Sequence, residues 1–398
     1  MSILKCNISK ARCIAGVDAV SCLPEELKKL GVTRPMVVSD AGVAGLEKHH
    51  KTMQLLKNAG LEPCLFDAVT PNPKDYEVMR GTAQYRESGC DGVIGIGGGS
   101  SMDCAKGISV MARHEGDIMD YGRSTPNRKF FTHGREPLFC VPTTTGTGSE
   151  ISPHAVITNT KKDKKSDVED HLFYSDVFFF DPEFAATQSA EILRDTGIDA
   201  LSHAIDSYTN RKMLTINSPF HEVLALKCCE LVARSLRKAI ACAGADLDCV
   251  LDLQWAAMMG GCVLDLDAGA MHGLSGVLQK YRHEMTHGVS CGILMPAVMQ
   301  YNLQTCPDKF AKIACAMGAD GTGVSQTTLA ETAVSEVRRL LRDIDFPCFA
   351  DFYFSDAELD EMAEIGASNS LIPLNPRPID RQQARKIYQA AQQESAEK

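Results

Sequence analysis

Three histidines fall within one short stretch, MHGLSGVLQKYRHEMTHG, at residues 271–288. They are His272, His283 and His287, and the chain has only 11 histidines in all. Neutral imidazole is a common side-chain ligand of transition metals. The stretch is therefore a candidate metal site. Its spacing alone also fits one core histidine and two surface ones, with His283 and His287 on one helix face.

A second stretch, DTGIDALSHAIDSY at 195–208, supplies a carboxylate and a fourth histidine. Asp199 and His203 are four residues apart, so they lie one turn apart on the same face of a predicted helix. Apolar neighbours predict that this helix is largely buried, where a carboxylate needs a strong partner. One carboxylate with imidazoles favours Zn²⁺ or Fe²⁺ over Mg²⁺ or Ca²⁺. An ordinary Asp–His pair on a helix surface is the alternative.

A glycine-rich stretch, GIGGGSSMDCAKG at 95–107, follows a predicted strand and opens a predicted helix. Consecutive glycines let backbone N–H groups approach a phosphate, and the helix N-terminus adds partial positive charge. No Gly-Lys-Ser/Thr follows, which disfavours a P-loop NTPase. A tight strand-to-helix turn is the structural alternative to a phosphate-binding loop.

Asp40 ends an earlier predicted strand, RPMVVSD at 34–40. A carboxylate at this place can meet the adenosine ribose and repel a 2′-phosphate, which favours NAD(H) over NADP(H). Capping of the following helix is an equally good interpretation of Asp40 from the sequence.

The elements that must position these residues change character along the chain. The first half alternates strands with helices, including strands at 34–40, at 62–69 and, running into glycines, at 91–99, and helices at 41–59 and 74–88. This rhythm predicts a mostly parallel sheet with helices on both faces. Helical segments fill most of 188–398. The sequence therefore predicts an α/β domain over residues 1–185 and an all-α domain over 186–398.

Composition limits the class of protein. The chain has 398 residues, 44% of them hydrophobic and 23% charged, which suits a soluble two-domain protein. A net charge of −10 argues against a nucleic-acid partner. We expect no signal peptide and no membrane-spanning apolar run. The 16 cysteines form no C-x-x-C pair, so we expect reduced thiols, a cytoplasmic location and, more weakly, a low-oxygen environment.

Taken together, the motifs resemble the metal-dependent, or iron-activated, alcohol dehydrogenase family over essentially the full chain. The motifs that carry the resemblance, in order, are TPNP (70–73), GGGSSMDCAK (97–106), PTTTGTGSE (142–150), DP (181–182), DALSHAID (199–206), His272 and HGVSCGILMP (287–296). The resemblance implies a Rossmann-like nucleotide domain and a helical metal domain, the fold shared with dehydroquinate synthase, with catalysis in the cleft between them.

The resemblance also implies roles for residues that match the family's motifs. The implied metal ligands are Asp199, His203, His272 and His287. The implied cofactor contacts are Asp40 at the ribose, Gly97, Gly98, Gly99 and Ser100 at the pyrophosphate, Thr143, Thr144 and Thr147 at the nicotinamide, and Asn72, Asp103 and Lys165 elsewhere on the nucleotide.

Two departures from the family pattern concern the substrate side. The family commonly has a second histidine four residues after the third ligand, but this chain has Gly276 there. The interval to His287 is one residue longer than usual, so we expect the loop 277–286 to bulge. His283 is either a proton-relay group in the vacant place or, slightly favoured, an exposed loop residue.

The expected chemistry is reversible reduction of a small aldehyde to a primary alcohol, with the metal as Lewis acid on the substrate oxygen and NADH as hydride donor. A short neutral aldehyde or diol is the default substrate. Arg211, Lys212 and Arg282 raise the alternative of an anionic substrate such as sulfoacetaldehyde.

Two other classes compete with this interpretation. One is a dehydroquinate-synthase-like lyase on the related scaffold, which would need more basic residues for a phosphorylated substrate. The other is a non-catalytic scaffold subunit, which the intact ligands and nucleotide loop disfavour. The resemblance also implies a homo-oligomer, a dimer or larger.

Overall fold

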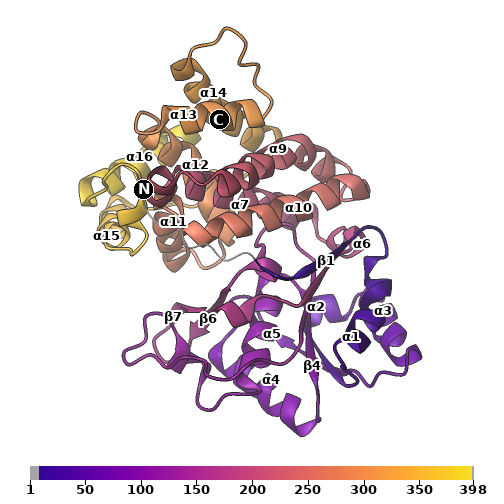
Figure 1. The fold of residues 1–398 in the computed structure, drawn as a ribbon. Coiled ribbons are helices and arrows are strands. Elements are labelled where there is room, and N and C mark those ends of the chain that lie inside the picture. Colours follow the sequence, from indigo (N-terminus) through magenta and orange to yellow (C-terminus); the bar gives the residue numbers. More distant parts are fainter. Residues whose placement is uncertain (1–8, 397–398) are drawn as a thin grey trace. The chain divides into compact units, whose positions relative to one another are not determined.

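The computed structural model describes residues 9–396, which form two compact units. The α/β unit comprises residues 9–144 and 148–188, and the helical unit comprises 145–147 and 189–396. A parallel α/β domain in the N-terminal half and a helical domain in the C-terminal half confirm the predicted fold class (Figure 1).

The α/β unit is built on one six-stranded parallel sheet with strand order β1-β8-β5-β4-β2-β3. Its strands are β1 (Arg12–Ala15), β2 (Pro35–Asp40), β3 (Cys64–Val69), β4 (Gly92–Gly97), β5 (Leu138–Pro142) and β8 (Val177–Phe180). All residues of the central strands β4 and β5 are buried. Strands covered on both faces need apolar side chains on both, which explains their continuous apolar sequence.

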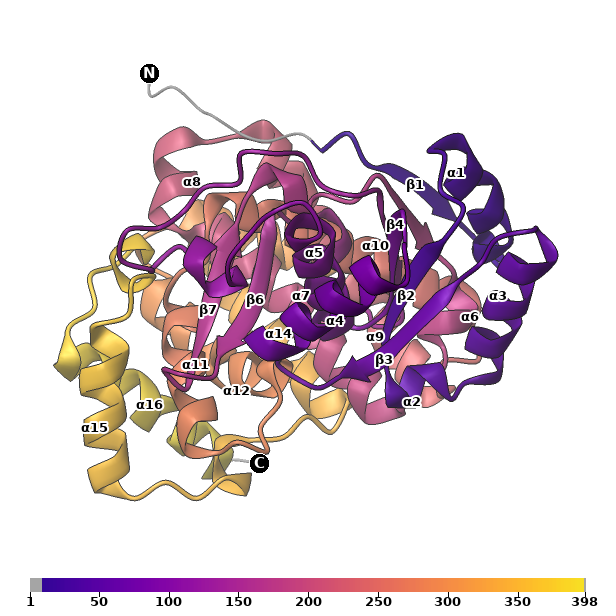
Figure 2. The ribbon, with the colours of Figure 1, turned by 90° about the horizontal axis from the view of Figure 1, so that it is seen from below.

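Helices cover both faces of this sheet, and a small antiparallel pair of strands, β6 (His154–Asn159) and β7 (Lys164–Glu169), lies beside it. The helices of the unit are α1 (Leu23–Lys29), α2 (Ala41–Ala44), α3 (Glu47–Asn58), α4 (Asp75–Glu87), α5 (Gly99–Met111) and α6 (Pro182–Ala185). One buried cluster joins α1 and α3 to the sheet, and Figure 2 shows α4 and α5 lying across the strands. The close approach of α5 requires Gly95, whose added Cβ would lie 3.0 Å from the Ala105 Cβ.

The sequence predicts one helix over 41–59, but the structure has two, α2 and α3. Asp40 accepts a hydrogen bond from the Val43 N–H and caps the short α2. Leu46, between the two helices, has extended backbone angles. The apolar periodicity of the segment does not reveal this break, because Gly45 keeps helical angles and only Leu46 leaves them.

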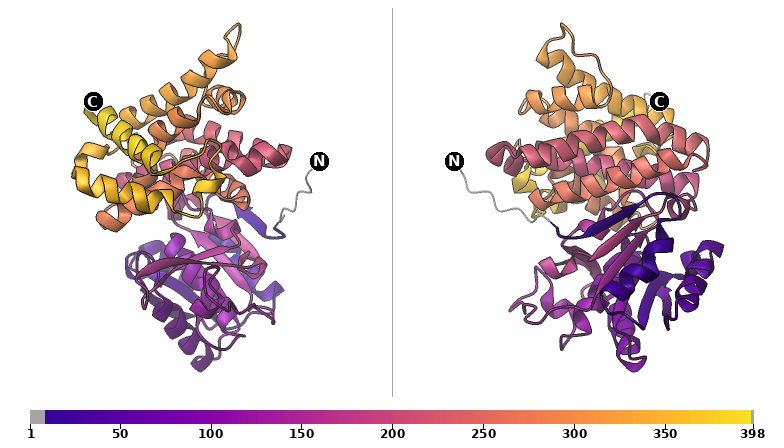
Figure 3. Two further views of the ribbon diagram at one scale, coloured as in Figure 1. Left: turned by 90° about the vertical axis from the view of Figure 1, so that its left-hand side faces the viewer. Right: turned by 45° about the vertical axis from the view of Figure 1, so that its right-hand side comes forward.

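The helical unit packs around α7, which contacts α9, α10, α11 and α12. Its helices are α7 (Ala190–Thr209), α8 (Arg211–Ile216), α9 (Pro219–Ala241), α10 (Leu247–Val263), α11 (Ala270–Tyr281), α12 (His287–Asn302), α13 (Pro307–Ala316), α14 (Gln326–Asp343), α15 (Asp356–Ala367) and α16 (Arg381–Ala396). Figure 3 shows them from two further sides. Most of α7 beyond Leu193 is buried, so its polar residues must find partners inside the unit.

One stretch of the helical unit, Leu247–Leu266, is long and apolar enough to cross a membrane by length and composition. Half of it is buried inside the structure, where α10 packs against α7 and α9. Asp248 and Asp252 interrupt it, so a search for uninterrupted apolar residues does not find it. Burial of this kind is also found in the core helices of soluble proteins.

Candidate active site

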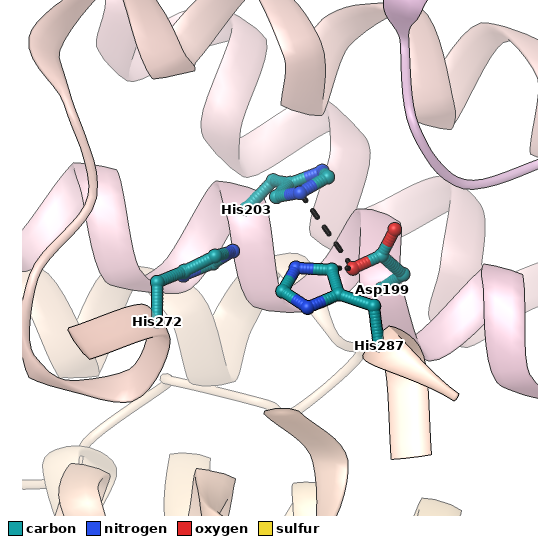
Figure 4. A group of neighbouring side chains, drawn as sticks. All are labelled: Asp199, His203, His272 and His287. Carbon is teal, nitrogen blue, oxygen red and sulfur yellow. Dashed lines mark ion pairs between the residues drawn. The ribbon is translucent and has the colours of Figure 1, made fainter. Parts of the chain in front are cut away.

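Four ligating side chains meet in the helical unit. Asp199 and His203 come from α7, His272 from the first turn of α11, and His287 from the first residue of α12. Each offers one ligand atom, and these atoms all lie within 4.8 Å of one another (Figure 4). We call these four residues the metal-ligand group.

The geometry within the metal-ligand group places a carboxylate against imidazoles. The Nε2 atoms of His203 and His287 each lie 3.6 Å from the Asp199 Oδ1. The rings of His203 and His272 are stacked, with centroids 5.1 Å apart. Burial lowers the pKa of His203 below its usual value, and His272 acts in the same direction while Asp199 opposes it. His203 therefore favours the neutral form, which is the form that coordinates metals.

The local sequence explains how His287 reaches Asp199. Thr286 caps α12 by accepting a hydrogen bond from the Val289 N–H, and its own hydroxyl donates to Asp195 of α7 at 3.0 Å. Residue 288 is glycine because an added Cβ would lie 2.0 Å from the Asp195 carbonyl oxygen. The start of α12 can therefore press against α7 only when no side chain follows His287.

A buried nitrogen tests whether these residues fit a metal ion. The Nδ1 of His272 lies 2.9 Å from Asp206 Oδ2, while its buried Nε2 has no hydrogen-bond partner among residues 9–396. A buried polar atom left in this way is rare in proteins, and a metal ion would satisfy it. Three imidazoles and one carboxylate are also a donor set suited to Fe²⁺ or Zn²⁺. The residues present fit such an ion.

The structure separates His283 from the metal-ligand group. The spacing fits His283 and His287 to one helix face, but α12 begins only at His287, and His283 lies exposed in the preceding turn. The expected bulge over 277–286 is also wrong in extent, because 277–281 form the last turn of α11. The connection between the two helices is thus confined to 282–286.

In the α/β unit the glycine loop lies at the carboxyl edge of the sheet, where β4 ends. Gly97 has a φ of 155°, which disfavours any side chain, and α5 begins at Gly99. An added Cβ on Gly98 would lie 3.1 Å from the Thr144 Cγ2. The N–H of Thr143 donates to the Gly97 carbonyl at 2.9 Å. The glycine loop and the start of the threonine loop therefore lie side by side, at a helix N-terminus of the kind that binds phosphate in other proteins.

Two more predicted cofactor residues lie against this loop. Asp40, besides capping α2, accepts a hydrogen bond from Ser101 at 3.4 Å. The backbone N–H of Asn72 donates to the hydroxyl of Ser100 at 3.2 Å. Sequence motifs that are far apart along the chain thus converge on one edge, which is where parallel α/β sheets bind nucleotides.

Three predicted cofactor residues differ from these in their surroundings. Asp103 accepts hydrogen bonds from the Ser149 hydroxyl at 2.6 Å and the Val156 N–H at 2.9 Å. Its carboxylate therefore links α5 to Ser149 and to β6 within the α/β unit. Lys165 is exposed on β7. Thr147 belongs to the segment 145–147, which packs within the helical unit, where Thr145 and Thr196 are hydrogen-bonded at 3.0 Å.

One residue in contact with the metal-ligand group, Asp206, was not among the site residues predicted from the sequence. Asp206 lies three residues after His203 on α7 and is 2% exposed. A signal was present, because positions 199, 203 and 206 share one face of a helix. Nothing in the local sequence indicated that its partner would be His272, 66 residues away.

Comparison with known proteins places the chain in one family. Residues 10–182 match the family described as "Iron-containing alcohol dehydrogenase", and residues 194–392 match "Fe-containing alcohol dehydrogenase family, C-terminal". The chain is 33% identical over 380 residues to the 1,3-propanediol dehydrogenase of Klebsiella pneumoniae, covering 94% of this chain and 96% of the relative.

Solved structures agree with this match. A crystal structure of 1,3-propanediol oxidoreductase aligns with a TM-score of 0.89 and 33% identity, covering 96% of this chain and 97% of that one. The sulfoacetaldehyde reductase of Bifidobacterium kashiwanohense, solved with NAD⁺, shares the fold with a TM-score of 0.88 over 98% of this chain and 99% of that one, at 21% identity. The chain therefore belongs to the iron-containing alcohol dehydrogenase family, whose oxidoreductases interconvert alcohols and aldehydes.

Proposed function

We propose that the protein is an NAD(H)-dependent, divalent-metal-dependent enzyme that reduces a small uncharged aldehyde to a primary alcohol and catalyses the reverse reaction. The observation that carries the proposal is the convergence of Asp199, His203, His272 and His287, whose ligand atoms lie within 4.8 Å of one another. Residues 186–398 would supply the metal site, and residues 1–185 would bind NAD(H).

Each set of residues has a defined part in this proposal. A bound metal would supply Lewis acidity to the substrate oxygen, and NADH would supply the hydride. The buried Asp199 and His203 and the partly buried His272 and His287 would together hold the metal. Gly97, Gly98, Gly99 and Ser100 would hold the pyrophosphate. Thr143, Thr144 and Thr147 would line the nicotinamide.

The partners of the basic residues that could bind an anionic substrate favour an uncharged substrate instead. Lys212 forms a salt bridge with Asp267, and Arg282 forms one with Glu358 at 3.1 Å. Arg282 also stacks on the ring of Phe354, with its guanidinium carbon 4.4 Å from the centroid. These two side chains are already neutralised within the helical unit, so an anionic head group such as a sulfonate would have to displace a carboxylate. Arg211, which is exposed and contacts the Pro373 carbonyl at 3.5 Å, is the remaining candidate.

An NADH-oxidation screen over matched aldehydes tests the substrate class. We expect turnover of short neutral aldehydes, including a hydroxyaldehyde, to exceed that of sulfoacetaldehyde and of a carboxylated aldehyde of equal length. Arg211→Gln is the matched variant, because it should leave the neutral substrates unaffected. Faster turnover of the anionic aldehydes, lost in this variant and at high salt, would overturn the proposal of an uncharged substrate.

Asp40 supports a preference for NAD(H) over NADP(H). Its carboxylate stands at the end of β2 beside the glycine loop, where it would repel a 2′-phosphate. We expect Asp40→Ser to raise the affinity for NADPH relative to NADH. Equal use of both cofactors by the unaltered protein would contradict this assignment.

The cysteines and the edge of the sheet bear on the cellular setting and on the assembly. Every cysteine within residues 9–396 is a free thiol, which supports a reducing compartment such as the cytoplasm. β1 lies at one edge of the sheet in the described structure, so its outer side can pair with a second copy. We propose a homodimer formed there, to be checked by sedimentation of the wild-type protein and of Cys13→Pro, which should be a monomer. A wild-type monomer, or a variant that still dimerises, would contradict the proposal.

A further inference from the structure

A buried carboxylate connects two helices of the metal-ligand group. Asp206 lies on α7, seven residues after Asp199 and three after His203. Its Oδ2 accepts hydrogen bonds from the Gly269 N–H at 2.8 Å and the His272 N–H at 3.1 Å. The residue is 2% exposed, so these bonds form away from solvent.

These bonds give α11 its N-terminal cap. Gly269 occupies the N-cap position of α11 and has no side chain to accept a hydrogen bond from the first turn. Asp206 supplies the missing acceptor from another helix, and its negative charge also suits the positive end of α11. An added Cβ on Gly269 would lie 2.8 Å from Asp206 Oδ1, so the glycine makes room for the carboxylate.

The same carboxylate determines which nitrogen of His272 carries the proton. The Nδ1 of His272 lies 2.9 Å from Asp206 Oδ2. An ionised carboxylate only accepts hydrogen bonds, so Nδ1 must donate. A neutral imidazole with its proton on Nδ1 has a lone pair on Nε2, the atom that has no hydrogen-bond partner within residues 9–396.

A second aspartate on α7 provides a comparison. Asp195 also ties α7 to a ligand-bearing helix, because it accepts a hydrogen bond from the Thr286 hydroxyl at the start of α12. It is 7% exposed. Its bond goes to the cap residue, whereas the bond of Asp206 goes to the ring of the ligand itself.

We propose that Asp206 is a positioning residue that fixes the ring of His272 with its Nε2 lone pair toward the metal-ligand group and strengthens that nitrogen as a donor. The inference rests on the proposed metal-dependent function. Carboxylates bonded to the distal nitrogen of a coordinating histidine commonly orient it and raise its basicity. Asp206 would do so while its backbone bonds keep His272 in place.

The test compares Zn²⁺ affinity in the wild-type protein and in two variants, by competition with a chelating dye. Asp206→Ala removes the acceptor, and we expect affinity to fall about tenfold to a hundredfold. Asp206→Asn keeps an acceptor oxygen and the shape but removes the charge, and we expect a loss of about threefold to fivefold, because a charge-assisted hydrogen bond is roughly twice as strong as a neutral one.

Nitrogen-15 NMR of the metal-free proteins measures which nitrogen of His272 carries the proton. This second measurement should not change if Asp206 only caps α11. We expect His272 in the wild type to be protonated on Nδ1, and Asp206→Ala to shift protons to Nε2. Asp195→Asn is the matched control, with an unchanged His272 tautomer and affinity within about twofold, since the asparagine oxygen can still accept the Thr286 bond and no ligand ring is touched.

Three results would overturn the inference. These are wild-type Zn²⁺ affinity in Asp206→Asn, an equal loss in Asp195→Asn, or a wild-type His272 protonated on Nε2. If Asp206→Ala does not fold, Asp206→Asn and the wild-type tautomer still decide the question. Absence of metal binding by the wild type would refute the proposed function instead, while the tautomer of the metal-free protein would still test the position of Asp206.

Discussion

Two groups of ligating side chains in this protein differ in what surrounds their carboxylates. In the helical unit, the oxygen of Asp199 faces the imidazoles of His203 and His287. In the α/β unit, His154, Asp167 and Glu169 gather on the strand pair β6–β7, and we call them the hairpin group. There the guanidinium of Arg123 lies 3.7 Å from Asp167 and 3.5 Å from Glu169.

A third group shows the same pattern as the hairpin group. Asp18, Asp181 and Glu183 come together in the α/β unit, but the ammonium of Lys48 pairs with both Asp181, at 3.2 Å, and Glu183. In both of these groups a cationic side chain thus already pairs with the carboxylates. Proximity of acids and histidines is therefore a weak criterion. A metal centre also needs neutral donors whose lone pairs point inward, as we propose for His272 Nε2.

The largest expected effect is the loss of a ligand from the metal-ligand group. Replacing His272 with Ala should abolish stoichiometric metal binding and reduce aldehyde reduction by roughly a thousandfold, because Lewis-acid stabilisation is worth several kcal/mol. Metal analysis and NADH oxidation on the same preparation measure both effects, with circular dichroism to confirm folding. A folded variant that retains metal and activity would refute the assignment of His272.

The next effect in size concerns the close approach of α12 to α7. Gly288→Ala places a methyl group against the Asp195 carbonyl and should cost about 1–3 kcal/mol of stability, with a matching loss of metal affinity as His287 is displaced. Gly276→Ala is the control, because an added Cβ there meets nothing within 4 Å. Thermal unfolding and Zn²⁺ titration would show whether the two alanines differ as expected. Equal behaviour would mean that helix approach does not position the ligand.

A smaller, pH-dependent effect is expected from the hairpin group. Burial alone would lower the pKa of His154, but its hydrogen bond to Asp167 and the nearby Glu169 raise it above the usual value. A raised pKa in the folded state stabilises the protein below the ordinary histidine pKa of about 6.5, and this contribution is lost as pH rises through the raised value.

Asp167→Asn should therefore destabilise the protein by up to about 1 kcal/mol near pH 6 and by less near pH 9. Denaturant unfolding at the two pH values measures the difference. A larger loss at the higher pH would contradict the sign of this argument.

The last prediction is that a substitution in the hairpin group leaves the metal content unchanged. His154→Ala removes the imidazole of the hairpin group, where Arg123 already balances the acids. Metal stoichiometry and NADH oxidation should remain those of the wild type. Loss of a bound ion in this variant would show that the hairpin group, too, is a metal site.

Much of this architecture is visible in the sequence, because the relevant signals are local. The glycine loop can be predicted because three glycines, Gly97 to Gly99, come directly after an apolar strand. Asp199 and His203 can be paired because they lie one helical turn apart. The fold class follows from the alternation of strands and helices and is confirmed.

The remaining features depend on contacts between distant residues. The break between α2 and α3 occurs at Leu46, whose type does not predict extended backbone. The position of His283 depends on where α11 ends, and local periodicity does not fix that point. The bond between Asp206 and His272 joins residues on separate helices, so only the packed structure reveals it.

Anomalous diffraction at the metal absorption edge, on crystals of protein purified anaerobically and supplied with Fe²⁺, tests the central claim most directly. We predict one peak within about 2.0–2.2 Å of the ligand nitrogens of His203, His272 and His287 and the carboxylate of Asp199. A peak beside His154 and Asp167 instead, or none between the four side chains of the metal-ligand group, would contradict the account.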